Sequence, residues 1–133
     1  MLLTSKAQSC ALQGKKYFNE KGEKMAKIKF LPIDGLLEMK ANNEKFKLVE
    51  VLREESFKEG HVPGAISIPL DQLGEKAKNL LKKSDKVIVY CASYGCKAST
   101  KATEMLMKMG YKKTMDFKGG KKQWVDSGLE LEK

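Results

Sequence analysis

Short apolar runs alternate with stretches of amphipathic pattern along most of this chain. The runs at 28–31, 47–51, 65–68, 86–90 and 114–117 predict strands. Apolar residues at helical spacing predict helices that start near residue 32, cover 71–81 and 97–109, and follow Gly119 and Gly120, with a helical turn at 54–58. Alternating strands and helices are typical of an α/β fold, here a small open parallel β-sheet of about five strands with helices on both faces.

One of these strands leads directly into a cysteine. The run 86–90 has the most strongly buried pattern of the five, and Cys91 follows it at the carboxyl end, where open α/β sheets bind their ligands. Five small or polar residues come next, and then the helix at 97–109 begins. A thiol in such a loop faces backbone N–H groups and the positive end of a helix, which favours the nucleophilic thiolate. We therefore predict that Cys91 carries the chemistry.

Length and composition indicate one folded domain with a different N-terminal segment. The chain has 133 residues, of which 41% are hydrophobic, enough for a single core. Residues 1–24 are polar, rich in lysine and broken by glycine, so we expect there a flexible tail or an upstream extension of the natural chain, followed by the domain at 25–133. No run reaches the roughly 20 apolar residues that span a bilayer, and none resembles a secretory signal.

The number of cysteines and the net charge indicate the cellular compartment and the kinds of partner to expect. Three cysteines (Cys10, Cys91 and Cys96) are too few for a disulfide scaffold and predict a reducing, cytoplasmic compartment. The net charge of +9 comes from 26 basic residues, mostly lysines, against 17 acidic ones. Because the lysines are spread along the chain without an arginine-rich or aromatic stripe, we expect a solvated basic surface and neither a nucleic-acid nor a membrane partner.

Three separated blocks carry a resemblance to a known family. The strand 48–51 is followed at 60–69 by GHVPGAISIP, which is similar to the family turn G-H-I-P-G-A-x-x-I-P. Residues 87–91 read VIVYC, similar to the active-site entry V-V-Y-C, and Gly119, Gly120, Trp124 and Gly128 match a closing G-G-x-x-x-W-x-x-x-G pattern. From about residue 27 to its end the chain resembles single-domain rhodaneses, which are sulfurtransferases, and in particular a subgroup with a second cysteine in the active-site loop.

The resemblance implies transfer of sulfane sulfur. In such proteins the loop cysteine, here Cys91, takes sulfur from a small anionic donor such as thiosulfate, a polysulfide or a persulfide, and holds it as a persulfide. Cyanide, a thiol or a partner protein then accepts the sulfur. The chemistry requires no metal and no organic cofactor. The loop residues would cradle the anionic sulfur with their N–H groups: Ala92, Ser93, Tyr94, Gly95, Cys96 and Lys97.

Two departures from the family pattern keep alternatives open. The family often reads D-V-R in the second strand, where this chain has Glu50, Val51 and Leu52, so the arginine is displaced to Arg53 or lost. Five residues separate Cys91 from Lys97, as in the C-x5-R loop of cysteine-dependent phosphatases, although lysine lacks the planar fork of arginine. An arsenate- or phosphate-handling enzyme of the same fold, or a non-catalytic persulfide carrier, therefore remains as an alternative.

Three further side chains receive sequence-based interpretations. Cys96 is either a resolving thiol, which forms a disulfide with Cys91 and releases sulfur, or a small side chain that fills the underside of the loop. His61 lies in a turn and is expected to fix that turn by a hydrogen bond rather than to act as a base. Trp124 is expected to anchor the core. The sequence makes no prediction of the oligomeric state.

Overall fold

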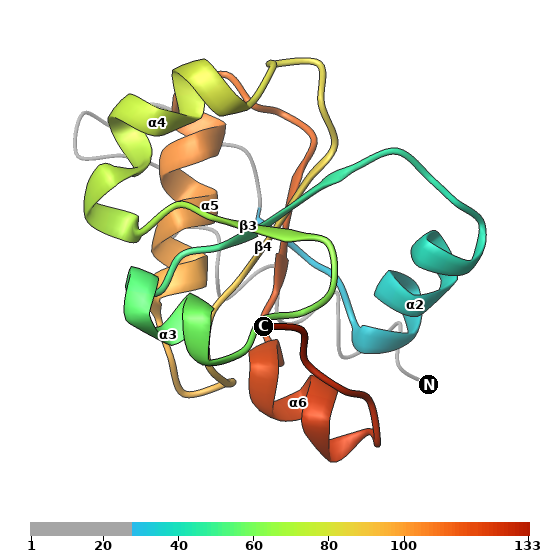
Figure 1. Ribbon diagram of the computed structural model, residues 1–133. Helices are drawn as coiled ribbons and strands as arrows, with labels where there is room; N and C mark the ends of the chain where they lie inside the picture. Colours follow the sequence, from blue (N-terminus) through green and yellow to red (C-terminus); the bar gives the residue numbers. More distant parts are fainter. Residues whose placement is uncertain (1–27) are drawn as a thin grey trace, which may run out of the picture.

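The computed structural model describes residues 28–133, and they form a five-stranded sheet in which all strands are parallel (Figure 1). The predicted tail at 1–24, the domain start at 25 and Cys10 lie outside the described residues. The spatial strand order is β1-β5-β4-β2-β3, which places β4 at the centre. The predicted α/β class and strand number are confirmed. The strands are β1 (Lys29–Phe30), β2 (Lys47–Glu50), β3 (Ala65–Ser67), β4 (Val87–Tyr90) and β5 (Thr114–Phe117).

Helices cover both faces of the sheet, as predicted (Figure 1). One face packs against α4 and α5, and the opposite face packs against α2 and α6. The helix expected at 71–81 divides into a short 3₁₀ turn, η2, and the helix α4. No helix within 28–133 combines the length and the apolar character needed to cross a membrane. The helical elements are α2 (Ile33–Ala41), α3 (Glu54–Glu59), η2 (Leu70–Gln72), α4 (Leu73–Leu80), α5 (Ala98–Lys108) and α6 (Gly120–Asp126).

The central strand β4 is buried on both faces because its side chains alternate between two apolar clusters. Val87 and Val89 pack with residues of α4 and α5, whereas Ile88 and Tyr90 pack with residues of α2 and α6. This two-residue period is the geometry of any strand, and a parallel strand covered on both faces needs apolar residues at every position. The unbroken run VIVY therefore specifies the middle of the sheet, and Trp124, only 4% exposed, anchors the α6 side as predicted.

Strand register brings the functional segments to one edge of the sheet. Glu50 of β2 and Phe117 of β5 flank Tyr90 of β4 in register. The residues that follow these strands therefore share the carboxyl edge with Cys91. The opposite edge carries the segments that enter the same three strands, which are rich in lysine.

His61 fixes a turn, as the sequence predicted. Its Nδ1–H donates to the Phe57 carbonyl at 3.0 Å, and its ring stacks on Phe57 with centroids 3.8 Å apart. Its backbone pairs with Glu132 near the end of the chain, and its Nε2 lies 3.3 Å from the Glu132 carboxylate. These contacts tie the C-terminal segment to the turn, so His61 acts in the structure as a packing and hydrogen-bonding residue.

Candidate active site

Cys91 lies at the carboxyl end of the central strand and is completely buried. The loop after it turns back on itself, because the N–H of Cys96 donates to the Ser93 carbonyl at 3.0 Å. The Cys91 thiol in turn donates to the Cys96 carbonyl at 3.5 Å. Helix α5 begins directly after Lys97. The predicted order of strand, cysteine, loop and helix is therefore present.

Backbone groups of the closing block hold this loop in place. The N–H of Lys121 donates to the Cys91 carbonyl at 3.1 Å, and the N–H of Lys122 donates to the Ala92 carbonyl at 2.9 Å. Gly120, between the loop and these donors, has φ +61, and a Cβ at this position would collide with the Cys91 carbonyl. Only glycine allows both this left-handed conformation and such a close approach of two backbones. The block at 119–120 is thus part of the site although it lies far from Cys91 in sequence.

The protonation of Cys91 differs from the sequence-based expectation. Burial raises the pKa of the Cys91 thiol, and a hydrogen bond and a repulsive charge from Cys96 add to this effect. Hydrogen bonds from the hydroxyl and the N–H of Ser99 lower the pKa but do not compensate. The Ser99 hydroxyl is itself buried in the first turn of α5 and has no hydrogen-bond partner among the nitrogen and oxygen atoms of residues 28–133. Burial of Cys91 thus opposes the favoured thiolate that the sequence predicts, because removal from water penalises the charged form of the thiol.

The hydrogen-bond donors that stabilise a thiolate surround Cys96 instead. Partial burial raises the pKa of Cys96, but hydrogen bonds from the Cys91 side chain and from the N–H groups of Ala92 and Ala98 outweigh it and lower the pKa overall. The positive charge of Lys118 lowers it further. Of the two neighbouring thiols, Cys96 is thus the one whose pKa is lowered and Cys91 the one whose pKa is raised. Both thiols are free, with no disulfide between them.

Lys118 is held beside the loop by a buried polar chain. Its Nζ donates to the Thr100 hydroxyl at 3.1 Å, and that hydroxyl donates to the Asp116 carboxylate at 2.8 Å. Asp116 is fully buried on β5, and its other carboxylate oxygen has no hydrogen-bond partner within the described part of the chain. Sequence reasoning missed this trio. One feature of the sequence could have indicated Lys118: it directly follows the strand β5. Because β5 lies next to β4, the carboxyl ends of both strands meet at one edge of the sheet.

Lys97, unlike Lys118, is not held beside the loop sulfurs by hydrogen bonds. Its side chain is exposed, and within 28–133 it forms no ion pair and no side-chain hydrogen bond. The basic group whose charge bears on the loop sulfurs is Lys118. Of the residues predicted to line the loop, Ser93, Tyr94 and Gly95 border a pocket of about 510 Å³ between the loop and α6, and Tyr94 is 61% exposed at its rim.

The family arginine is replaced from a distant part of the chain. Arg53 is exposed and makes no ion pair with any residue from 28 to 133. The buried Glu50 carboxylate instead forms an ion pair with Lys121 at 3.1 Å and accepts a hydrogen bond from the Tyr90 hydroxyl at 2.8 Å. Lys121 also donates to the carbonyl of Ser56 at 2.8 Å. One lysine thus joins β2, α3 and the start of α6 directly beneath the loop.

No group of three or more His, Cys, Asp or Glu side chains in the described part of the chain is arranged to hold a metal ion. The site consists of two thiols, a serine hydroxyl, backbone N–H groups and one nearby lysine. This set can perform nucleophilic sulfur chemistry and can stabilise an anion. Among residues 28–133, no hydrogen bond joins the Cys91 thiol to an imidazole or carboxyl group that would act as a general acid.

Comparison with known proteins identifies the domain. The family model for the rhodanese-like domain matches residues 34–127. The chain belongs to the rhodanese-like domain family. A "Sulfurtransferase" of Allochromatium vinosum is 28% identical over 98 residues, which cover 74% of this chain and 89% of that protein. The solved structure of BH2092 from Bacillus halodurans superposes with a TM-score of 0.72 at 26% identity and covers 97% of this chain and 85% of the other.

A third relative has a longer chain. The "Putative sulfur carrier protein YrkF" of Bacillus subtilis is 25% identical over 103 residues, which cover 77% of this chain but 54% of that protein. The present chain thus spans about half the length of YrkF. The rhodanese-like domain predicted from the three sequence blocks is confirmed, and its family includes proteins named for both transferring and carrying sulfur.

Proposed function

We propose that this rhodanese-like domain is a sulfurtransferase that carries sulfane sulfur as a persulfide on Cys91. The Cys91 thiolate attacks the outer sulfur of a donor such as thiosulfate. The S–S bond of the donor breaks and sulfite leaves with the bonding electron pair. Cyanide or a thiolate then attacks the outer sulfur of the Cys91 persulfide and regenerates the Cys91 thiolate. The observation that carries this proposal is the place of Cys91, buried at the end of the central strand inside a closed loop.

The thiolate needed for attack can arise within the loop. Cys96 is the more acidic of the two thiols, and the Cys91 side chain hydrogen-bonds to it. Movement of the Cys91 proton to the Cys96 thiolate gives a Cys91 thiolate and a neutral Cys96, with no net change of charge. The hydroxyl and N–H of Ser99 then stabilise the new thiolate. Loop residues 92–97 and Lys118 would attract the anionic donor.

A second role for Cys96 is resolution of the persulfide. The Cys96 thiolate would attack the inner sulfur of the Cys91 persulfide, form a Cys91–Cys96 disulfide and release hydrosulfide. A reducing thiol would then restore both cysteines. The partial exposure of Cys96 and its lowered pKa favour this role over that of a purely space-filling side chain.

Intact-mass and peptide mass spectrometry test the proposal. After incubation with thiosulfate, a mass increase of one sulfur atom is expected on the peptide containing Cys91, and cyanide should remove it and yield thiocyanate. Cys91→Ser should abolish both. A Cys96→Ser variant that still gains the sulfur but no longer releases hydrosulfide supports resolution, whereas unchanged hydrosulfide release contradicts it. Absence of the adduct with thiosulfate, polysulfide and glutathione persulfide would overturn the proposal.

The same experiment separates the alternatives. A carrier in the sense of the YrkF name would gain the sulfur on Cys91 but turn over slowly with cyanide and small thiols, and would need a protein acceptor. A phosphate- or arsenate-handling enzyme would hydrolyse an aryl phosphate or reduce arsenate without gaining sulfur. Lys97 stands where the phosphatase loop has arginine, and its single ammonium group cannot grip an oxyanion with two parallel hydrogen bonds, which gives this second alternative little support.

A further inference from the structure

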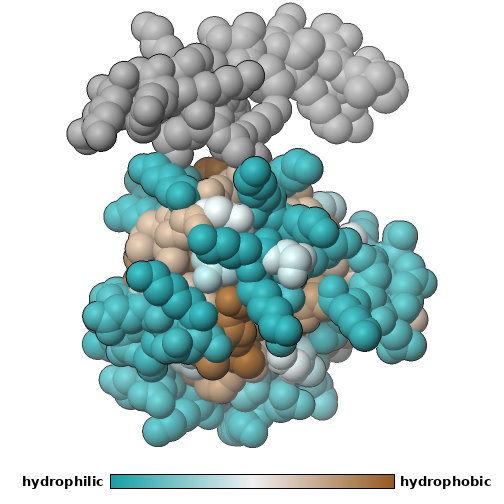
Figure 2. All heavy atoms as spheres, turned by 90° about the horizontal axis from the view of Figure 1, so that it is seen from above, coloured by the Kyte–Doolittle hydropathy of each residue, from teal (hydrophilic) through white to brown (hydrophobic). Residues whose placement is uncertain are grey.

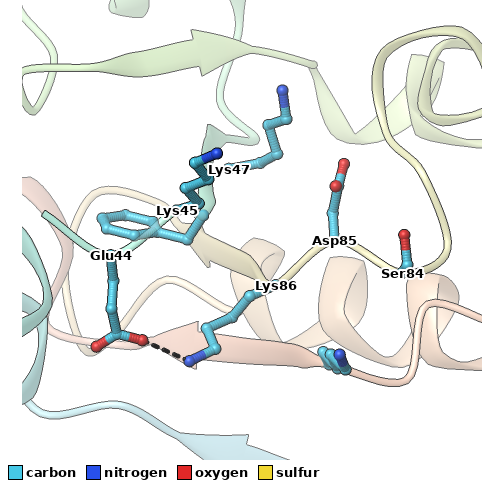
Figure 3. A pocket seen from close by; sticks show the side chains of 8 residues that line it. Glu44, Lys45, Lys47, Ser84, Asp85 and Lys86 are labelled. Atoms are coloured by element: carbon cyan, nitrogen blue, oxygen red, sulfur yellow. Dashed lines mark hydrogen bonds and ion pairs between the residues drawn. The ribbon is translucent and has the colours of Figure 1, made fainter.

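A second pocket lies at the sheet edge opposite to Cys91. It has a volume of about 560 Å³ and is formed by the segments that enter β2, β4 and β5 (Figure 3). Four of its eight lining residues are lysines: Lys45, Lys47, Lys86 and Lys113. Figure 2 looks onto this end of the molecule, where hydrophilic side chains cover most of the described surface. The function proposed for Cys91 does not use this pocket.

Sheet register explains why these lysines gather. The N–H of Lys47 donates to the carbonyl of Lys86 at 2.8 Å, and the N–H of Val87 donates to the carbonyl of Lys113 at 3.0 Å. The three lysines therefore stand at the entrances of adjacent strands, which are about 4.8 Å apart. Lys45 precedes Lys47 by two residues, and Figure 3 shows both side chains extending to the same side of the pocket. The fold thus concentrates four positive charges that are scattered in the sequence.

The acidic residues of the pocket do not balance this charge. Glu44 pairs with Lys86 at 2.6 Å, which occupies one lysine (Figure 3). The carboxylate of Asp85 accepts a hydrogen bond from the N–H of Lys82 at 2.9 Å. Among residues 28–133, Lys45, Lys47 and Lys113 form no ion pair. Like charges that line one pocket repel one another, and an anion bound between them would reduce the repulsion.

We propose that this pocket binds a small anion with a chain of two or more phosphates. Ammonium groups spread over three strands match charges spread along such a chain better than a single small anion, and lysine serves as a point-charge partner for phosphate. The volume lies within the range of small-molecule sites. Phe46 also lines the pocket and offers an apolar surface next to Lys45. The phosphate chain is common to inorganic polyphosphate and to nucleoside triphosphates.

Isothermal titration calorimetry with inorganic tripolyphosphate, without divalent metal and at physiological salt concentration, tests the site. Saturable binding with one equivalent per chain is expected. The variant Lys45→Gln/Lys113→Gln removes two exposed lysines that make no side-chain hydrogen bond in the described structure, and it should weaken binding at least tenfold. The control Lys58→Gln/Lys76→Gln makes the same change of net charge on α3 and α4 and should change affinity less than twofold.

The outcomes distinguish the possible phosphate ligands and the possible binding sites on the protein. Equal affinity for ATP and tripolyphosphate identifies the phosphate chain as the ligand, and tighter binding of ATP shows that a nucleoside adds contacts; both support the proposal. Non-saturable binding, or equal weakening in the control variant, reduces the effect to net charge and overturns it. Loss of binding in Lys97→Gln but not in the double variant places the anion at the Cys91 loop and also overturns it. Thiocyanate formation should be unchanged in the double variant.

Discussion

Replacing Lys121 with methionine tests the contact that joins the active-site loop to the core. Met has the length and much of the apolar volume of the lysine stem, so the change removes mainly the ammonium group. That group lies 3.1 Å from the Glu50 carboxylate and donates to the Ser56 carbonyl at 2.8 Å and to the Ser56 hydroxyl at 3.1 Å. In the variant, Glu50 retains only the hydrogen bond from the Tyr90 hydroxyl in a fully buried position.

The expected loss of stability follows from this burial. Breaking a buried ion pair by removing one partner costs about 3–5 kcal/mol, because the remaining charge is left unpaired in a poorly solvating interior. The side chain of Lys121 is 15% exposed and that of Glu50 is not exposed, so we expect the lower part of this range, about 3 kcal/mol. For a domain of this size that loss lowers the unfolding temperature by roughly 10 °C.

Lys122→Met is a matched control. Lys122 is the next residue along α6, and its ion pair with Asp126 is exposed, with side chains 69% and 59% accessible. An exposed pair of this kind is worth about 0.3–0.5 kcal/mol. Urea unfolding of both variants measures the two losses. In a Glu50→Gln background, Lys121→Met should cost markedly less. Equal losses for the two lysines, or no difference between backgrounds, would refute the reasoning.

Three further predictions concern the loop, and a fourth, on α4, is the control for the glycine substitution. In Cys96→Ser, Cys91 loses the thiolate that accepts its proton in the proposed mechanism, while burial still raises the pKa of Cys91, so the pH profile of persulfide formation should shift to higher pH, as followed by stopped-flow sulfite release. Lys118→Gln should raise the pKa of Cys96, measured by the pH dependence of its alkylation with iodoacetamide, and an unchanged titration contradicts the assigned contact. Gly120→Ala should destabilise the domain by about 2 kcal/mol or more and slow sulfur transfer, because φ +61 and the Cys91 carbonyl exclude a Cβ. Gly74→Ala, with open space around the added Cβ, should be neutral or stabilising by up to about 1 kcal/mol in the same urea titration.

The fold was predictable because local pattern and global topology agree in this chain. The unbroken apolar run of β4 requires two covered faces, which places it at the sheet centre, and a cysteine after it must reach the carboxyl edge. The resemblance included Gly120 in the closing block, but nothing in the sequence indicated its left-handed conformation. Its physical reason, the close approach to the Cys91 backbone, depends on a contact between distant segments. The sequence therefore predicts the position of the reactive loop but not what holds it there.

The partner of Glu50 could not be read from the sequence. The missing arginine suggested Arg53 as a substitute because it is adjacent in the chain, but that side chain points to solvent. The actual partner, Lys121, reaches Glu50 because the start of α6 packs beneath the ends of β2 and β4. Pairing between side chains at a sheet edge depends on strand register and on where the helices pack. Neither can be read directly from the amino-acid sequence.

The protonation of the two cysteines depends on the balance of opposing effects in three dimensions. The helix N-terminus and the loop N–H groups do favour a thiolate, as the sequence suggested. However, the N–H groups of Ala92 and Ala98 donate to Cys96 and lower the pKa of that thiol. Cys91 receives full desolvation and fewer compensating donors. A thiol that stays protonated until an anionic donor enters is protected from oxidation, which requires the thiolate. The same burial that raises the pKa of Cys91 thus limits its reaction with oxidants, and in the function proposed above proton transfer to Cys96 would provide the thiolate when a donor occupies the loop.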